Sequence, residues 1–168
     1  LVVDSKEVDG QILRQKNDVW SIDLGRLTLE SSGAGMADIG ALTEEMKPED
    51  LIPVNIEIDK LTLRNEVGSY EDYGNYQFKL RPEGAKLKIE DFTALIKGIS
   101  VTAQDPIIWD GHTNTTFFKG EITGQDLADV LPLWGYEVNM DSASFTSTGE
   151  VTWQGSPLNL PLGNYKGK

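Results

Sequence analysis

The 168-residue sequence contains no cysteine and only one histidine, His112. Without thiols there is no disulfide, thiolate nucleophile or cysteine metal site, and one imidazole is too few for a histidine-rich metal site. Cationic residues are also scarce: 15 lysines and arginines stand against 27 aspartates and glutamates, a net charge of −12. This balance argues against nucleic acid as a partner, and less strongly against anionic lipid headgroups, because both bind cationic surfaces.

Long apolar runs are missing as well. No stretch approaches the roughly 18 apolar residues of a membrane helix, and Lys97 and Gly98 interrupt the longest apolar region, residues 92–103. The sequence begins with Leu1 and has neither an initial methionine nor a signal peptide. We therefore expect a piece excised from a longer protein, with any membrane anchor outside it.

The remaining composition is that of a folded domain. Hydrophobic residues make up 39% of the chain, and the 17 glycines bring the apolar share close to half. The chain is long enough to bury a core, which argues against intrinsic disorder. We expect a single segment over residues 1–168. Small residues dominate positions 31–40, so a flexible loop is expected over residues 31–47.

Alternation of apolar and polar residues dominates the sequence. Because successive side chains of a strand point to opposite faces, this pattern predicts a mostly β protein with a half-buried antiparallel sheet. Turn signals such as Arg81-Pro82-Glu83-Gly84 separate the alternating stretches. The clearest apolar sets are Trp20, Ile22 and Leu24; Tyr76, Phe78 and Leu80; Ile99, Val101 and Ala103; Phe118, Gly120 and Ile122; and Val151 with Trp153.

Two short helices are also predicted. Pro48 stands at a favourable first helical position, with Glu49 and Asp50 behind it. A second helix is expected to follow the capping box at residues 123–126. Its apolar stripe consists of Leu127, Val130, Leu131 and Trp134.

An eight-residue pattern recurs in the sequence: apolar, polar, apolar, two polar, apolar, Thr or Ser, apolar. It occurs at residues 22–29, 56–63, 87–94 and 138–145, with Gly25 counted as polar in the first copy. The alternation slips by one at the paired polar residues, which would turn the following apolar residues to the opposite face. A β-bulge there would keep all four apolar residues on one face and curve the strand. Repetition at this spacing indicates a stacked array.

A series of short motifs also follows in order along nearly the whole chain. They lie at residues 4–12, 20–24, 27–29, 52–58, 61–63, 73–74, 87–89, 120–122, 126–136 and 151–158. The most specific is the Trp153-Gln154-Gly155-Ser156-Pro157-Leu158 turn that ends the series. In this order the motifs resemble the late part of AsmA-like proteins of the YhdP branch.

The resemblance implies a curved, bulged and repeat-built sheet that forms an open groove, with one or two short helices. It implies a periplasmic segment of an envelope protein of Gram-negative bacteria, held in the inner membrane by an N-terminal helix outside this chain. Such proteins are similar to bridge-like lipid transfer proteins. Phospholipid is the implied partner, carried between the inner and outer membranes with contact to the outer membrane. The family has no catalytic residues to carry over, and no cofactor or metal is expected.

The apolar residues of the predicted strands are the candidate lining of that groove, because a continuous apolar surface favours acyl chains. Sequence alone does not distinguish groove lining from the core of an ordinary β-sandwich. The candidates are Ile22, Leu24, Leu27, Leu29, Ile56, Ile58, Leu61, Leu63, Phe78, Leu80, Leu87, Ile89, Phe92, Val101, Phe118, Ile122, Val151 and Trp153.

Two other functions remain open from the sequence. A β-sandwich carbohydrate-binding or adhesion module is the main alternative, with tryptophans and tyrosines as a sugar platform. A hydrolase with two carboxylates drawn from Glu71, Asp72 and Asp91 is a weaker one. The stretch from Asp110 to Asn114 combines an acid, a histidine and an amide, but an exposed turn explains it better than a metal site.

Overall fold

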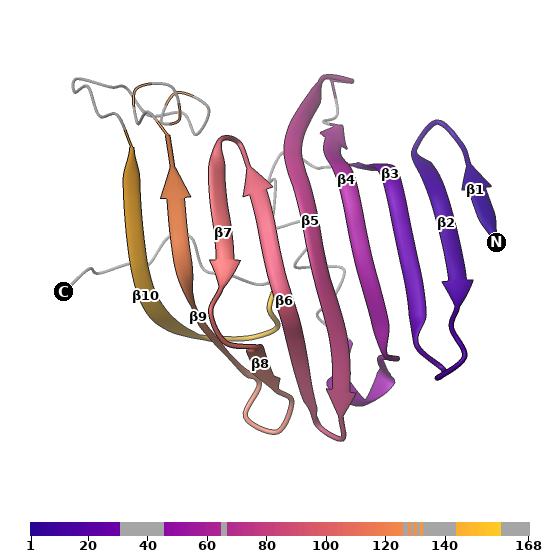
Figure 1. Ribbon diagram of the computed structural model, residues 1–168, viewed down its shortest axis with the longest axis vertical. Coiled ribbons are helices and arrows are strands. Elements are labelled where there is room, and N and C mark those ends of the chain that lie inside the picture. The colour runs from indigo at the N-terminus through magenta and orange to yellow at the C-terminus, as the bar shows by residue number, and fades with distance from the viewer. Residues whose placement is uncertain are drawn as a thin grey trace.

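The computed structural model describes residues 1–30, 46–64, 67–125, 128, 130, 132 and 144–158. These residues form one broad sheet of ten strands in the order β1-β2-β3-β4-β5-β6-β7-β9-β10, with β8 beside β6 and β9 (Figure 1). The strands are Val2–Asp4 (β1), Val8–Arg14 (β2), Trp20–Glu30 (β3), Val54–Arg64 (β4), Tyr70–Glu83 (β5), Lys86–Ile96 (β6), Ile99–Ala103 (β7), Ile107–Asp110 (β8), Thr115–Gly124 (β9) and Phe145–Gln154 (β10). The prediction of a mostly β protein is confirmed.

Neighbouring strands are antiparallel, as the alternation predicted, except for β3 and β4, which run parallel. A parallel pair cannot be joined by a tight hairpin and needs a crossover of about a dozen residues or more. The connection between these two strands, residues 31–53, has that length. The sheet is therefore mixed, and the sequence did not reveal this pair, because alternation is the same for either strand direction.

The sheet has one apolar and one polar face. Ile22 pairs with Ile56, and Ile56 pairs with Phe78, so three adjacent strands place apolar side chains side by side. This face is called the apolar face. The residues next to them, such as Asp23 and its partner Glu57, point to the opposite, polar face.

Bulges hold the apolar residues of the repeat on one face, as predicted. Leu24 pairs with Ile58 and Leu27 with Leu61, while the two residues between them on each strand are left out of the register. The register between β5 and β6 shifts at the corresponding place, where Asp91 adopts a φ of 52°. Of the copy at residues 138–145, only the last two positions lie within the described residues.

Two buried clusters lie on the apolar face. The first is formed by Leu87, Ile89, Ile107 and Trp109, with the partly buried Phe78, Phe92 and Phe118 against it. The second is formed by Leu61, Leu63 and Tyr73, with Leu27, Leu29 and Ile58 against it. The repeat residues therefore supply much of the packing of the described chain.

The first predicted helix is present as one 3₁₀ turn, η1 (Pro48–Asp50), with its proline at the start as expected. Leu51, just after η1, packs against the first cluster, so this turn lies on the apolar face. In the second predicted helix, Ala128, Val130 and Pro132 are helical and Val130 is buried. Its other residues, including most of its predicted stripe, lie outside the described residues.

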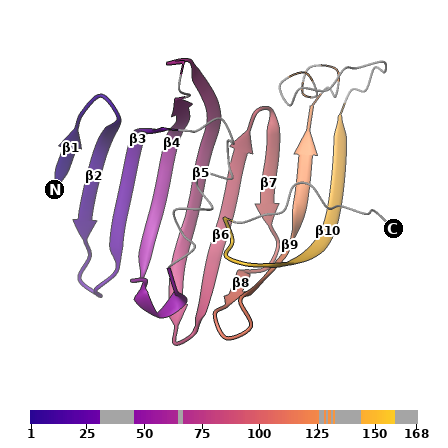
Figure 2. The same ribbon diagram turned by 180° about the vertical axis from the view of Figure 1, so that it is seen from behind.

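The C-terminal end of β10 curls over the apolar face. It passes behind β9 and β8 in Figure 1 and in front of them in Figure 2, where η1 also lies toward the viewer. The turn motif at residues 153–158 fixes this end: Trp153 Nε1 donates to Ser156 O at 2.9 Å, and Thr116 Oγ1 donates to Gly155 O at 2.7 Å. Gly155 has a φ of 110°, which favours glycine there.

No helix in the described part of the chain is long and apolar enough to cross a membrane.

Candidate functional site: the apolar face of the sheet

All the predicted lining residues lie on the apolar face. The clearest evidence is one row of paired residues that crosses the sheet from β2 to β10, which is called the crossing row. Its members are Gly10, Leu24, Ile58, Tyr76, Ala94, Val101, Ile122 and Ser147. Among these, only Tyr76 and Ser147 carry a polar atom in the side chain. The tertiary pairing thus joins short apolar sets from distant parts of the sequence into one continuous surface.

The predicted lining residues differ in how far they are covered. Leu61, Leu63, Leu87, Ile89 and Trp153 are buried, with at most 8% of each residue exposed. Most of the others are half-buried, and Ile122 is 37% exposed. The described residues contain no second sheet against this face. The apolar face is thus buried in its two clusters and partly accessible between and beside them.

A row of small residues crosses the apolar face at β7, β9 and β10. Ala103 pairs with Gly120, and Gly120 pairs with Gly149. A Cβ atom built on Gly149 would have no described atom within 4 Å. At Gly120, in contrast, a Cβ atom would lie 2.3 Å from the ring of Phe118, so this ring covers the middle of the row and only the Gly149 end is open.

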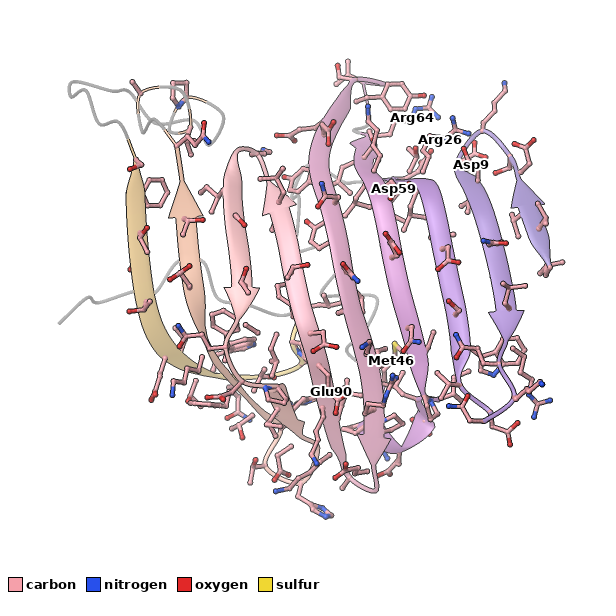
Figure 3. All side chains as sticks on the ribbon, in the orientation of Figure 1. Asp9, Arg26, Met46, Asp59, Arg64 and Glu90 are labelled. Atoms are coloured by element: carbon pink, nitrogen blue, oxygen red, sulfur yellow. The ribbon has the colours of Figure 1, made fainter. Side chains whose placement is uncertain are left out.

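The polar face carries ion pairs (Figure 3). Two of the three acids considered as a hydrolase pair lie in such pairs: Asp72 Oδ2 is 3.6 Å from Lys60 Nζ, and Asp91 Oδ2 is 2.5 Å from Lys79 Nζ. The third, Glu71, lies opposite Leu63 at the edge of the apolar face and is paired with Lys97. Each carboxylate thus has a cationic partner of its own, and the arrangement offers no obvious acid and base acting together.

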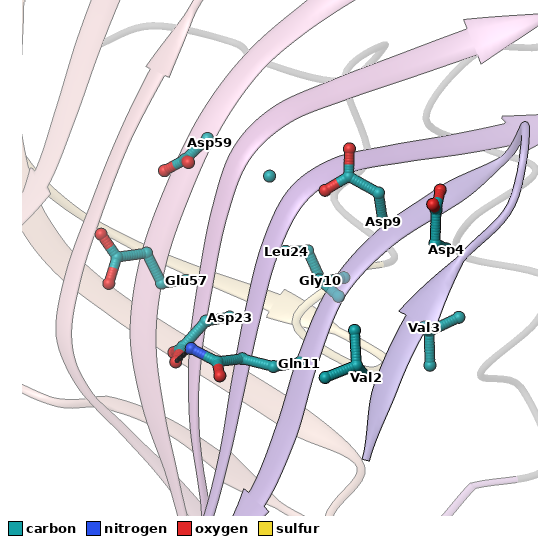
Figure 4. Close-up of a pocket in the computed structure, with 11 residues that line it drawn as sticks. Val2, Val3, Asp4, Asp9, Gly10, Gln11, Asp23, Leu24, Glu57 and Asp59 are labelled. Carbon is teal, nitrogen blue, oxygen red and sulfur yellow. Dashed lines mark hydrogen bonds between the residues drawn. The ribbon is translucent and has the colours of Figure 1, made fainter.

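An open hollow of about 570 Å³ lies on the polar face across β1 to β4 (Figure 4). It forms beside the bulge at Gly25, where a Cβ atom would come within 2.8 Å of Asp9 Oδ1. Its wall is acidic, through Asp4, Asp9, Asp23, Glu57 and Asp59. The described residues nevertheless contain no group of three or more metal-ligating side chains close enough to hold an ion.

A second hollow of about 510 Å³ lies next to the first, with Lys6, Arg26 and Lys60 in its wall. Asp9 and Gly25 belong to both hollows. Lys60 and Arg26 are paired with Asp72 and Asp9 at 3.6 and 3.7 Å, so much of their charge is compensated. These hollows are solvated features of the polar face.

His112 lies in an exposed turn, as expected. Asp110 Oδ1 accepts hydrogen bonds from the backbone N–H groups of His112 and Thr113, at 2.9 and 3.4 Å. Desolvation opposes ionisation of Asp110, but hydrogen bonds from Lys86 and from these two backbone groups lower its pKa overall. The acid, histidine and amide of this stretch thus build a turn.

Tyr76 is a distinctive residue of the apolar face that was not among the predicted lining residues. It lies between Ile58 of β4 and Ala94 of β6, and its hydroxyl is buried without a hydrogen-bond partner. Burial, followed by the neighbouring Tyr73, raises the pKa of Tyr76 to about 12. The alternation correctly placed the residue on this face, but no local pattern shows that its hydroxyl is unpaired.

The comparison with known protein families agrees with the order of motifs in the sequence. The family model described as YhdP protein matches residues 1–168, the whole chain. The chain belongs to the YhdP family. No curated protein and no solved structure matches it. YhdP proteins are a family of the cell envelope related to lipid transport.

Proposed function

We propose that this chain is a segment of a bacterial envelope lipid-transfer protein whose apolar face carries phospholipid acyl chains between the inner and outer membranes. The segment works in the periplasm and is joined to an inner-membrane anchor outside residues 1–168. It acts without catalysis, cofactor or metal. The half-buried and exposed members of the predicted lining, such as Ile56, Val101 and Ile122, form the surface on which the acyl chains lie, and the buried members pack beneath them.

The observation that carries this proposal is the crossing row. Seven inter-strand steps of ~4.8 Å from β2 to β10 give it a length of roughly 34 Å. The ~30 Å hydrocarbon core of a bilayer holds two leaflets, so one acyl chain spans about 15 Å, and the row is long enough to cover it. Removing one CH₂ group from water is worth about 0.8 kcal/mol. A row of this length therefore stabilises a bound acyl chain without any specific polar contact.

The two faces suit such a carrier in different ways. Ion pairs such as Arg14 with Asp18 and Lys88 with Glu83 cover the polar side and the strand ends with solvated charge. Half-buried residues such as Ile56 and Val101 leave apolar area on the other side. Exposed apolar area of this kind is costly in water and commonly marks a binding surface.

The β-sandwich carbohydrate-binding module has less support. A sandwich needs two packed sheets, and the described residues form one. Three of the four tryptophans can be located: Trp109 and Trp153 are buried and Trp20 is half-buried, so no exposed sugar platform is formed by them.

The test is to purify the 168-residue chain from a Gram-negative host, extract it with organic solvent and identify the extracted lipids by mass spectrometry. The delipidated chain is then incubated with vesicles of phosphatidylethanolamine and phosphatidylglycerol and re-isolated. Co-purified phospholipid and reloading from the vesicles are the expected results. Clean extracts and no reloading would overturn the proposal, and saturable binding to glycans would then favour the alternative.

A further inference from the structure

Tyr76 lies near the middle of the crossing row, with Ile58 and Ala94 as its direct neighbours. Its side chain packs against the cluster of Leu61, Leu63 and Tyr73. The hydroxyl is enclosed by the protein and finds no hydrogen-bond partner in the described part of the chain. A polar atom thus sits within an otherwise apolar stretch of the proposed lipid path.

Packing alone does not explain a tyrosine at this position. An enclosed hydroxyl without a partner costs free energy, whereas phenylalanine would fill the same space without that cost. Nearly all buried polar groups in proteins have a partner, so an exception calls for a cause. A cargo that brings its own acceptor would supply the missing partner.

The protonation state of the Tyr76 hydroxyl allows it to donate a hydrogen bond. Burial and the nearby Tyr73 keep its pKa at about 12, so it carries its proton throughout the neutral range. No carboxylate or carbonyl of the described chain competes for that proton. An acceptor oxygen on a bound molecule is therefore the complementary group.

We infer that Tyr76 donates a hydrogen bond to an ester carbonyl oxygen of the lipid carried on the apolar face. The inference rests on the proposed function and adds to it one specific hydrogen bond between the protein and the lipid. In a diacyl lipid the ester carbonyls are the acceptors next to the acyl chains, so they reach a donor on an apolar surface more readily than the phosphate does. The side chain is half-buried but the hydroxyl oxygen itself is enclosed, so the proposed contact requires the side chain to rotate when the lipid binds.

The surroundings of Tyr76 give the bound lipid a direction. On one side along β5, the rings of Phe78 and Phe92 lie with their centroids 6.2 Å apart and offer apolar contact. On the other side, the ammonium of Lys97 lies 4.6 Å from the ring centroid of Tyr73 and is paired with Glu71. The headgroup thus lies on the side of Lys97, and the acyl chains leave Tyr76 on the side of Phe78 and follow the crossing row from strand to strand.

The experiment compares two lipids that differ only in the proposed acceptor. The delipidated 168-residue chain is loaded from vesicles of diester phosphatidylglycerol or of its diether analogue, which has the same headgroup and chain length but no carbonyl. The unmodified chain is expected to retain the diester roughly threefold to tenfold better, the range of one hydrogen bond. Tyr76→Phe is expected to remove this preference by weakening diester retention alone.

Tyr70→Phe is the matched control, because Tyr70 is 66% exposed and lies outside the crossing row. It is expected to keep the diester preference. Equal retention of both lipids by the unmodified chain, or a preference that survives in Tyr76→Phe, would overturn the inference and leave the proposed function standing. Retention of neither lipid by the unmodified chain would overturn both. Near-ultraviolet circular dichroism confirms the fold of each variant.

Discussion

Leu24 on β3 and Ile58 on β4 are paired directly across two parallel strands, and the next pair in register joins Leu27 to Leu61. Both strands leave two residues out of the register at the same level, so the bulge of one copy of the repeat lies beside the bulge of the next. A bulge in only one strand would turn its following apolar residues away from those of its neighbour. The matched bulges therefore keep the apolar face continuous from strand to strand.

Ile58→Asp is expected to lower phospholipid loading roughly tenfold while the fold survives, because a carboxylate beside acyl chains loses its hydration. Ile58 is half-buried, so the charge keeps access to water in the empty protein. Loading is measured by mass spectrometry after incubation with vesicles. Asn55→Asp adds the same charge on the polar face of the same strand and keeps the acceptor for Arg81, so it should load normally. Unfolding of Ile58→Asp would place this residue in a closed core.

Leu87→Ala is expected to destabilise the protein by about 3 kcal/mol, because Leu87 is only 3% exposed and its truncation leaves a cavity in the first cluster. Ile22→Ala, at a half-buried position of the same face, is expected to cost roughly half as much. Urea unfolding followed by tryptophan fluorescence gives both values. Equal costs would mean that the two positions are equally enclosed.

Gly74→Ala is expected to destabilise the protein by more than about 2 kcal/mol. Gly74 has a φ of 81°, and an added Cβ would lie 1.6 Å from the carbonyl oxygen of Leu95, so the backbone of β6 must shift. Gly149→Ala is the control, since its Cβ enters open space, and it should be neutral or stabilising by a few tenths of a kcal/mol. Thermal unfolding distinguishes the two, and similar melting temperatures would contradict the prediction.

Tyr76 also predicts a dependence of stability on alkaline pH. Its pKa is about 12 in the folded protein against 10.0 for the ordinary phenol. Because the folded-state pKa is raised, the contribution of Tyr76 to the free energy of unfolding is fully present below pH 10. It is lost as the pH rises from 10 toward 12, since over this interval the tyrosine ionises in the unfolded chain but not in the folded protein. The unmodified chain should therefore lose more stability over this interval than Tyr76→Phe. Parallel urea midpoints for the two proteins from pH 9 to 12 would contradict the assignment.

Much of the strand structure was predictable, because it follows from short-range alternation. Trp20, Ile22 and Leu24 lie in β3 on one face as expected, and the bulges fall at the paired polar residues of the repeat. The turn at Pro48 was also predictable, because proline fixes its own backbone. These features depend on the conformational preferences of a few residues that are neighbours in the chain, and these residues can be read from the sequence.

The sequence allowed the apolar residues of the candidate site to be predicted, but not how these residues are placed next to one another. The sequence identified residues such as Leu24 and Val101 as members of one apolar set. It did not indicate that pairing places Leu24, Ile58, Tyr76 and Val101 in a single row. Nor did it show that the hydroxyl of Tyr76 has no partner, since this depends on every neighbour of the side chain.

By itself, the sequence determined which residues form strands, which side chains share a face and where each strand bends, because alternation and bulges act within one strand. Only the tertiary structure decided that β3 and β4 run parallel, that β6 pairs with β7 at one end and β8 at the other, and that the rows join into one surface. The physical reason is that every non-proline residue offers the same backbone N–H and C=O groups, so these groups do not select a particular neighbouring strand. The choice of neighbour and register therefore belongs to the packing of the whole sheet.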